Sequence, residues 1–280
     1  MNSKAGNLYI VATPIGNLGD ITYRAVDTLK KVDRILVEDT RHARTLLDHY
    51  AIRTPLQAFH DHNELKLIPT IMEALQQGES YAMISDAGTP LISDPGYKLV
   101  NQLQIAGIQA LTVPGACAAI AALCVSGMAT NRFAFEGFLP AKTAARLAAL
   151  EMLKQEPRTL IFYEGKHRII ACLQSMAQVF GAQREVVVGR ELTKKFETVV
   201  AGAFDDVIRQ IGSSPENQKG EFVILVEGLK LVAEDVDIEK ILTVLLEELS
   251  VKQASKLAAK LSGVSKNICY EKAVQLQQDK

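Results

Sequence analysis

The stretch Ser85–Tyr97, with the sequence SDAGTPLISDPGY, decides the fold of this chain. It follows the apolar run Tyr81–Ile84, which predicts a short buried strand. Two Gly and two Pro in the stretch stop the strand, because Gly permits positive φ and Pro removes a backbone donor. In an open α/β sheet, ligands bind in loops at the carboxyl ends of strands. The alternative is an ordinary surface loop, although loops this long are uncommon without a function.

Strand and helix patterns alternate around this loop. Short apolar runs predict strands at Leu8–Ala12, Arg34–Val37, Pro55–Phe59 and Gln109–Val113. Amphipathic or small-residue segments predict helices at Ile21–Val32, Thr40–Tyr50, Leu65–Gln77, Tyr97–Ile105 and Ala116–Val125. Such a βαβ series folds into a mostly parallel sheet with helices on both faces.

A second α/β unit is expected after Ser126-Gly127. Its strands are predicted at Thr159–Tyr163, Glu185–Val188 and Glu221–Val226, with Phe196–Val200 as a candidate antiparallel strand that would make the sheet mixed. Helices are expected at Ala141–Lys154 and His167–Phe180. The segment 128–140 carries three Phe residues, so we expect a connection that packs between the domains.

Past Gly228 the chain changes to helices without strands. The predicted organisation is therefore an α/β domain at 1–127, a second α/β domain at 128–228 and a helical extension at 229–280. In the extension, Lys252, Lys256 and Lys260 share one helix face, opposite Ala254, Leu257 and Leu261. This lysine row is either a solvated face or a contact for the phosphates of a nucleic acid.

Composition limits the class of protein. The 280 residues are 48% hydrophobic and 22% charged, with a formal net charge of -1, so no global field draws the chain to nucleic acid or membrane. Any contact with a polyanion needs a local basic patch. The four Cys lack zinc spacing and indicate buried thiols. The start lacks a signal-peptide core and no stretch reaches transmembrane length, so we expect a cytoplasmic protein without membrane contact.

A second loop of interest is Ala12–Asp20, ATPIGNLGD, between the first strand and the first helix. Pro14 stands where the dinucleotide fingerprint has its first Gly, and no P-loop Lys follows, which disfavours a Rossmann oxidoreductase. Asp20 is expected to cap the helix that begins at Ile21.

Five motifs, in their order and spacing, resemble the tetrapyrrole (corrin/porphyrin) methylase superfamily. They are LYIVATPIGNLGDITYRA, VEDTR, SDAGTPLISDPGY, VPGACAAIAAL and FEGFLP, and the similarity runs from about Leu8 to Gly228. Tetrapyrrole-acting members tend to carry a GxGPGD-type first loop and a GDP-type third loop. Both loops depart from these forms here, and the departure points to the branch of the family that acts on small-subunit ribosomal RNA.

The resemblance implies a fold of two α/β domains, with mostly parallel or mixed sheets, around a cleft that binds S-adenosylmethionine. The cofactor is expected to be held largely by backbone groups, and small side chains there allow close approach. The contacts carried over by motif are Pro14, Asp86, Ala87, Gly88, Thr89, Pro90, Ala116, Cys117, Phe162, Tyr163, Glu191, Leu192, Gly220 and Glu221. Cys117 would contribute its backbone, since nothing near it in the sequence lowers the pKa of a thiol.

The implied reaction is transfer of a methyl group to the ribose 2′-hydroxyl of a cytidine in 16S rRNA of the small ribosomal subunit. The resemblance also implies a homodimer. Basic clusters could hold the RNA at the carboxyl side of the sheets or form scattered surface charge; they are Lys166, His167 and Arg168, and Arg190, Lys194 and Lys195.

The hydroxyl is a poor nucleophile, so a base or a polarising cation should assist it. We predict Asp39 as base or orienter, with Arg41 and His60 near the RNA. A local cap or ion pair at the next helix is the alternative for Asp39 and Arg41. His60 and His62 raise metal binding, but no third ligand has matching spacing, so no metal is expected.

Two other functions remain open from the sequence. One is a methylase of the same fold that acts on a tetrapyrrole or a protein side chain. The other is a non-catalytic protein that binds RNA or a nucleotide.

Overall fold

The computed structural model describes residues 5–229 and 238–278. It divides into two compact units, Met1–Gly228 and Leu229–Lys280. Residues 230–237, which begin the predicted helical extension, lie outside the described residues.

The first sheet has five parallel strands in the order β3-β2-β4-β1-β5. The strands are β1 (Leu8–Val11), β2 (Arg34–Val37), β3 (Leu56–Ala58), β4 (Tyr81–Met83) and β5 (Ala110–Val113). Each lies within an apolar run that predicted it, and the inner strands are buried on both faces, as a parallel sheet requires.

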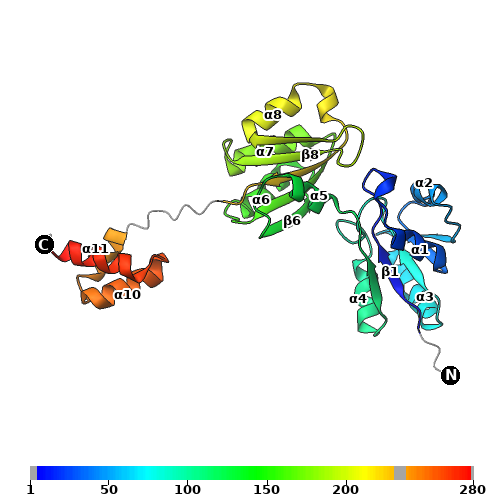
Figure 1. The fold of residues 1–280 in the computed structure, drawn as a ribbon, viewed down its shortest axis with the longest axis horizontal. Helices are drawn as coiled ribbons and strands as arrows, with labels where there is room; N and C mark the ends of the chain where they lie inside the picture. Colours follow the sequence, from blue (N-terminus) through cyan, green and yellow to red (C-terminus); the bar gives the residue numbers. More distant parts are fainter. Residues whose placement is uncertain (1–4, 230–237, 279–280) are drawn as a thin grey trace. The chain divides into compact units, whose positions relative to one another are not determined.

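Helices cover both faces of this sheet (Figure 1). They are α1 (Tyr23–Lys31), α2 (Thr40–His49), α3 (Glu64–Gln76) and α4 (Tyr97–Ile105). The first two share a core with Val11 and Val37, whereas α3 and α4 share another with Leu8 and Leu36. The cap expected at Asp20 lies at Thr22 instead, because Leu18–Asp20 form a short 3-10 turn and the Thr22 hydroxyl accepts the Ala25 amide.

The second sheet is mixed, with the order β6-β7-β10-β8-β9. Its strands are β6 (Phe133–Phe138), β7 (Thr159–Gly165), β8 (Glu185–Arg190), β9 (Thr198–Ala203) and β10 (Glu221–Val226). The predicted connection 128–140 is thus wrong in part, since β6 pairs parallel with β7. The expected antiparallel strand is confirmed as β9, paired with β8. The fold class predicted from the sequence is confirmed.

The two faces of the second sheet are covered by different parts of the chain. One face packs on α6 (Thr143–Met152), α7 (Ile169–Phe180) and α8 (Phe204–Gly212), the last of which the sequence reading missed. The other face packs on α5 (Ala118–Val125), which follows β5 of the first sheet. The same apolar cluster includes Ile15 of the loop after β1 and Ala116 and Cys117 of the loop before α5, so these two loops pack toward the second sheet.

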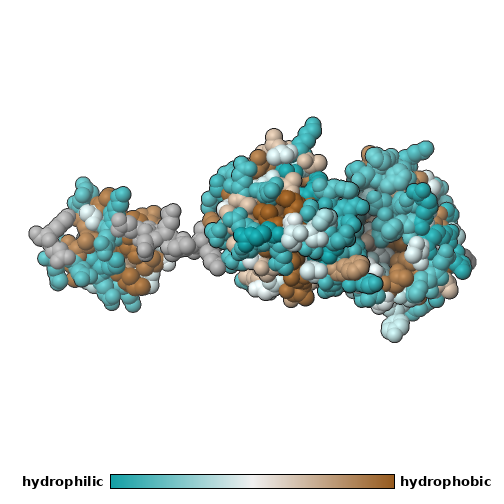
Figure 2. Space-filling model, turned by 90° about the horizontal axis from the view of Figure 1, so that it is seen from above, coloured by the Kyte–Doolittle hydropathy of each residue, from teal (hydrophilic) through white to brown (hydrophobic). Residues whose placement is uncertain are grey.

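The helical unit contains α9 (Ile238–Leu245), α10 (Val251–Ser262) and α11 (Lys266–Gln278). Its core includes Leu242, Ala254, Ala258 and Cys269. Leu257 and Leu261, predicted opposite the lysine row on the apolar face, are 41% and 66% exposed, because the small residues of α10 form its buried stripe. Apolar and polar residues are accordingly mixed on this unit's surface (Figure 2).

Among the described residues, no helix combines the length and hydropathy needed to cross a membrane.

Candidate active site

The crossover pattern of the first sheet places the site. The neighbouring strands β1 and β4 are each followed by a helix, α1 on one face of the sheet and α4 on the other. Chains that leave adjacent strands toward opposite faces open a crevice at the carboxyl ends, where α/β proteins bind ligands. The loops after β1 and β4 meet there. Thr13 and Gly88 form a two-hydrogen-bond bridge, with N···O distances of 2.8 and 3.2 Å.

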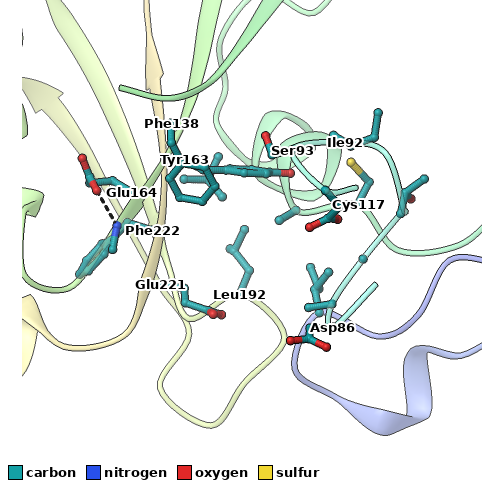
Figure 3. A pocket seen from close by; sticks show the side chains of 18 of the residues that line it. Asp86, Ile92, Ser93, Cys117, Phe138, Tyr163, Glu164, Leu192, Glu221 and Phe222 are labelled. Carbon is teal, nitrogen blue, oxygen red and sulfur yellow. Dashed lines mark hydrogen bonds between the residues drawn. The ribbon is translucent and has the colours of Figure 1, made fainter. Parts of the chain in front are cut away.

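A cavity of about 330 Å³ lies at these loops and is closed by the second sheet (Figure 3). Ligand pockets start at roughly this size. The lining from the first α/β half comprises Ile15, Asp86, Ala87, Gly88, Thr89, Ile92, Ser93, Asp94, Cys117 and Ala118. The lining from the second half comprises Phe138, Tyr163, Glu164, Gly165, Leu192, Lys194, Glu221, Phe222 and Val223.

The loop after β4 has an unusual backbone. Leu91 and Ser93 have φ of 72° and 68°, a region that residues with a Cβ rarely adopt, and Gly88 and Gly96 are also left-handed. Conformations of this kind cost energy and tend to persist where they serve a site. The loop is held to its neighbour by the Thr89 hydroxyl, which donates to the Ala116 carbonyl at 3.0 Å.

A second loop with left-handed residues follows β8. Glu191 and Thr193 have φ of 50° and 66°, and Leu192 between them is buried against the cavity. The ammonium of Lys194 bridges the carboxylates of Glu191 at 2.9 Å and Glu221 at 2.7 Å.

Two glycines allow this second loop to pack closely. A Cβ on Gly220 would lie 2.5 Å from Cγ of Glu191, and one on Gly16 would lie 2.4 Å from Cγ of Lys194. Gly16 belongs to the loop after β1, so Lys194 lies against the first α/β half while it pairs within the second. Bulk at Gly16 would therefore push the two sides of the cavity apart, whereas bulk at Gly220 would displace Glu191 within the second half.

Aromatic rings form the wall above Leu192 in Figure 3. The Tyr163 ring packs edge-to-face on Phe135 and Phe138, with centroids 4.8 and 5.6 Å away. Its hydroxyl accepts the Ala119 amide in the first turn of α5 at 3.1 Å. Burial, with Cys117 beside it, raises the pKa of Tyr163, so this residue remains a neutral part of the wall.

Carboxylates gather at the strand ends beside the cavity. Burial, reinforced by the charges of Glu38 and Asp86, raises the pKa of Asp94 to about 6. Burial and the charges of Asp86 and Asp61 also raise the pKa of Glu38. In residues 5–229, neither Asp94 nor Glu38 has an ion-pair partner. The region therefore favours a cationic ligand.

The structure brings together much of the predicted cofactor set. The residues of that set that line the cavity are Asp86, Ala87, Gly88, Thr89, Cys117, Tyr163, Leu192 and Glu221. The remaining predicted contacts, Pro14, Pro90, Ala116, Phe162, Glu191 and Gly220, adjoin lining residues in the chain without lining the cavity. Phe162 points into the core on the far face of its sheet. Their contacts with a cofactor stay predictions.

Sequence reasoning missed several lining residues. The loop Ser85–Tyr97 contains Ile92, Ser93 and Asp94, which line the cavity. The sequence alone could not show this, because their orientation depends on the left-handed residues of that loop. Phe138 was missed because β6 was read as a connection. One usable signal was the charged pair of Asp86 and Asp94 in a loop otherwise poor in charge.

The residues predicted for catalysis lie outside the cavity lining. Asp39 caps α2, accepting the Arg41 amide at 2.8 Å, and pairs with the Arg41 guanidinium at 2.9 Å. Hydrogen bonds from Arg41 lower the pKa of Asp39 to about 2, which makes it a weak base. The local cap and ion pair weighed as the alternative are therefore present. A catalytic role for Asp39 and Arg41 stays a prediction.

His60 lies close enough to Glu38 for its charge to oppose, in small part, the rise in the Glu38 pKa that burial and the charges of Asp86 and Asp61 produce. Its Nδ1 is buried without a hydrogen-bond partner, and its ring packs against His62 at 5.9 Å. In the part of the chain that the structure describes, no three His, Cys, Asp or Glu side chains are placed to hold a metal ion.

The cavity fits S-adenosylmethionine by its chemistry. The donor carries a sulfonium and an ammonium, and the cavity edge offers carboxylates without cationic partners. Backbone groups of the bridged loops and an apolar wall of Ile15, Leu192 and Val223 suit the rest of the molecule.

A more open hollow of about 960 Å³ adjoins the cavity and shares Phe138, Glu164, Gly165, Lys194 and Glu221 with it. Its other lining residues are Lys166, His167, Arg168, Glu191, Pro215, Gln218, Lys219 and Gly220. The predicted basic cluster after β7 therefore lies next to the cavity. Arg168 is already paired with the buried Glu164 at 2.7 Å.

Comparisons with known proteins agree with this geometry. Residues 7–208 match the family model of the tetrapyrrole (corrin/porphyrin) methylases, and residues 232–277 match the RsmI C-terminal HTH domain. Among curated proteins, the chain is 48% identical over 274 residues to the ribosomal RNA small subunit methyltransferase I of Pasteurella multocida, covering 97% of this chain and 98% of that protein. The protein of the same name from Xylella fastidiosa (strain Temecula1) is 51% identical over 270 residues, covering 96% and 99%.

Solved structures show the same fold at lower identity. Diphthine synthase aligns with a TM-score of 0.60 and 13% identity, over 80% of this chain and 90% of that one. Uroporphyrin-III C-methyltransferase from Thermus thermophilus, complexed with S-adenosylhomocysteine, aligns with a TM-score of 0.54 and 18% identity, over 80% and 98%.

Proposed function

Because the chain belongs to the tetrapyrrole (corrin/porphyrin) methylase family, we propose that it transfers a methyl group from S-adenosylmethionine to the ribose 2′-hydroxyl of a cytidine in 16S rRNA of the small ribosomal subunit. The observation that carries the proposal is the full-length similarity to ribosomal RNA small subunit methyltransferases I, which includes the helical unit as well as the methylase fold. The likeness to tetrapyrrole methylases supports the fold alone, since the identity there is low.

The cavity supplies what this transfer requires of a protein. The methyl donor is activated by its own sulfonium charge, so the chain must align the hydroxyl with the methyl group and exclude water. The donor would bind in a preformed cavity between the bridged loops after β1 and β4 and the aromatic wall at Tyr163. The adjoining hollow leaves room for a nucleotide beside it.

The helical unit is the second RNA contact that we propose. Lys252, Lys256 and Lys260 are exposed along α10, and the described part of this helix carries no acidic residue. Lysines placed this way bind phosphates without reading sequence. We also propose that the protein acts as a homodimer in the cytoplasm, where its ribosomal substrate is found.

The test is a tritiated methyl-transfer assay on 30S subunits from a strain that lacks the protein. Naked 16S rRNA and 50S subunits serve as controls. We expect label on the ribose of one cytidine of the 30S subunit. Label on no RNA would reject the proposed function, and label on a protein of the 30S subunit instead would favour a protein methylase of the same fold.

A further inference from the structure

Asp94 is the carboxylate at the cavity whose surroundings best suit proton transfer. It lines the cavity and lies between Ser93, which is left-handed, and Pro95, whose φ is fixed by its ring. The backbone on both sides is therefore restrained. Asp86 lines the same cavity, but its side chain is exposed.

The groups that face Asp94 come from three elements. Glu38 follows β2, Ser85 and Asp86 follow β4, and Tyr163 lies on β7. Two of these are carboxylates and two are hydroxyls. Among the described residues, no Lys, Arg or His side chain forms an ion pair with Asp94, so its carboxylate is free to accept a proton.

We propose that Asp94 is the residue that accepts the proton of the ribose 2′-hydroxyl during methyl transfer, which rests on the proposed function. As the new bond forms between the 2′-oxygen and the methyl carbon, the methyl–sulfur bond breaks and its electron pair stays on sulfur. The hydroxyl proton moves to a carboxylate oxygen of Asp94. The products are a 2′-O-methyl ribose, a neutral thioether and a protonated Asp94 that later loses its proton to water.

The electrostatic surroundings suit this role at neutral pH. With a pKa of about 6, raised chiefly by burial, Asp94 is ionised at pH 7 and is still a stronger base than an ordinary carboxylate. Asp39, ion-paired and outside the cavity lining, has a pKa of about 2 and is a poorer acceptor. The neighbouring charge of Glu38, which lies outside the cavity lining, also raises the pKa of Asp94.

The test measures single-turnover methylation of 30S subunits at saturating donor from pH 5 to 9. Asp94→Asn keeps the size and the acceptor for Ser85 but not the base, so we expect the rate at pH 8 to fall about 100- to 10,000-fold. Affinity for S-adenosylmethionine by calorimetry should fall modestly, because Asp94→Asn removes one negative charge from the cavity, and saturating donor keeps this loss out of the measured rate. Asp27→Asn, on the exposed face of α1, is the matched control with the wild-type rate.

The pH profile separates proton transfer from a structural role. In a plot of log rate against pH, the wild-type rate should fall below about pH 6 with a slope of one, which is the acid limb of the profile. The Asp94→Asn profile should lack this acid limb. Glu38→Gln should move the limb to lower pH, because it removes a negative neighbour. The assignment would be overturned if Asp94→Asn had the wild-type rate, or if weaker binding of S-adenosylmethionine accounted for the whole loss of rate. A wild-type enzyme inactive on 30S subunits would instead refute the proposed function.

Discussion

Gly88→Ala tests whether the bridged loops form the donor site. Gly88 has a φ of 85°, in which a residue with a Cβ costs about 1–2 kcal/mol. The added Cβ would also lie 3.3 Å from Cγ2 of Ile15, which lines the cavity. Without donor the substituted loop can relax, so binding must restore the strained conformation. Since 1.4 kcal/mol is about a factor of ten, we expect S-adenosylmethionine affinity to fall by about 5- to 30-fold.

Gly107→Ala is the matched control for this change. Gly107 lies between α4 and β5 with a φ of 70°, and nothing lies within 4 Å of the Cβ it would gain. The backbone cost is the same, but the cavity is untouched. Both variants should therefore lower the melting temperature, and isothermal titration calorimetry should find weaker donor binding in Gly88→Ala alone. Equal affinity for wild type and Gly88→Ala, or an equal loss in Gly107→Ala, would refute the reasoning.

Three further predictions follow from the same structure. Folding lowers the pKa of Asp39 from 3.8 to about 2, so its ionised carboxylate stabilises the fold above pH 3.8 and this contribution is lost as the pH falls toward 2. The difference in melting temperature between wild type and Asp39→Asn should therefore shrink as the pH is lowered from 4 toward 2. Replacing Lys252, Lys256 and Lys260 with Glu should weaken RNA binding and reduce the slope of log binding constant against log salt concentration by about 2 to 3, while donor affinity stays unchanged. An unaltered slope would show that these lysines do not contact the RNA. Leu242→Ala should cost about 2–5 kcal/mol in the small helical core, so hydrogen exchange should show loss of protection in the helical unit only.

The sequence predicted most of the first α/β half because its strands are short, apolar and bounded by Gly and Pro. Arg34–Val37 and Tyr97–Ile105 were predicted with their observed bounds. The strand β6 was missed because its Phe residues alternate with Ala, Glu and Gly on an edge strand with a bulge, where two of the three rings are exposed. Edge strands give weak apolar patterns because only one face is buried.

For the site, the sequence indicated the loops but not the side chains that face the cavity. Asp86 and Gly88 follow from a motif at a strand end. Asp94 depends on the left-handed turns at Leu91 and Ser93, which no local residue preference predicts. The same limit applies to Leu257 and Leu261, because a helical period places them on one face but cannot say which face a neighbouring helix covers.

The bridge between Thr13 and Gly88 has an evolutionary consequence. Two loops that are 75 residues apart in the chain share one short ladder, so a substitution in either one displaces the other. Adaptation to a different methyl donor or acceptor would then require paired substitutions, and lineages that change position 13 should carry a compensating change near position 88. The substitutions accepted in one loop would then depend on the residues present in the other.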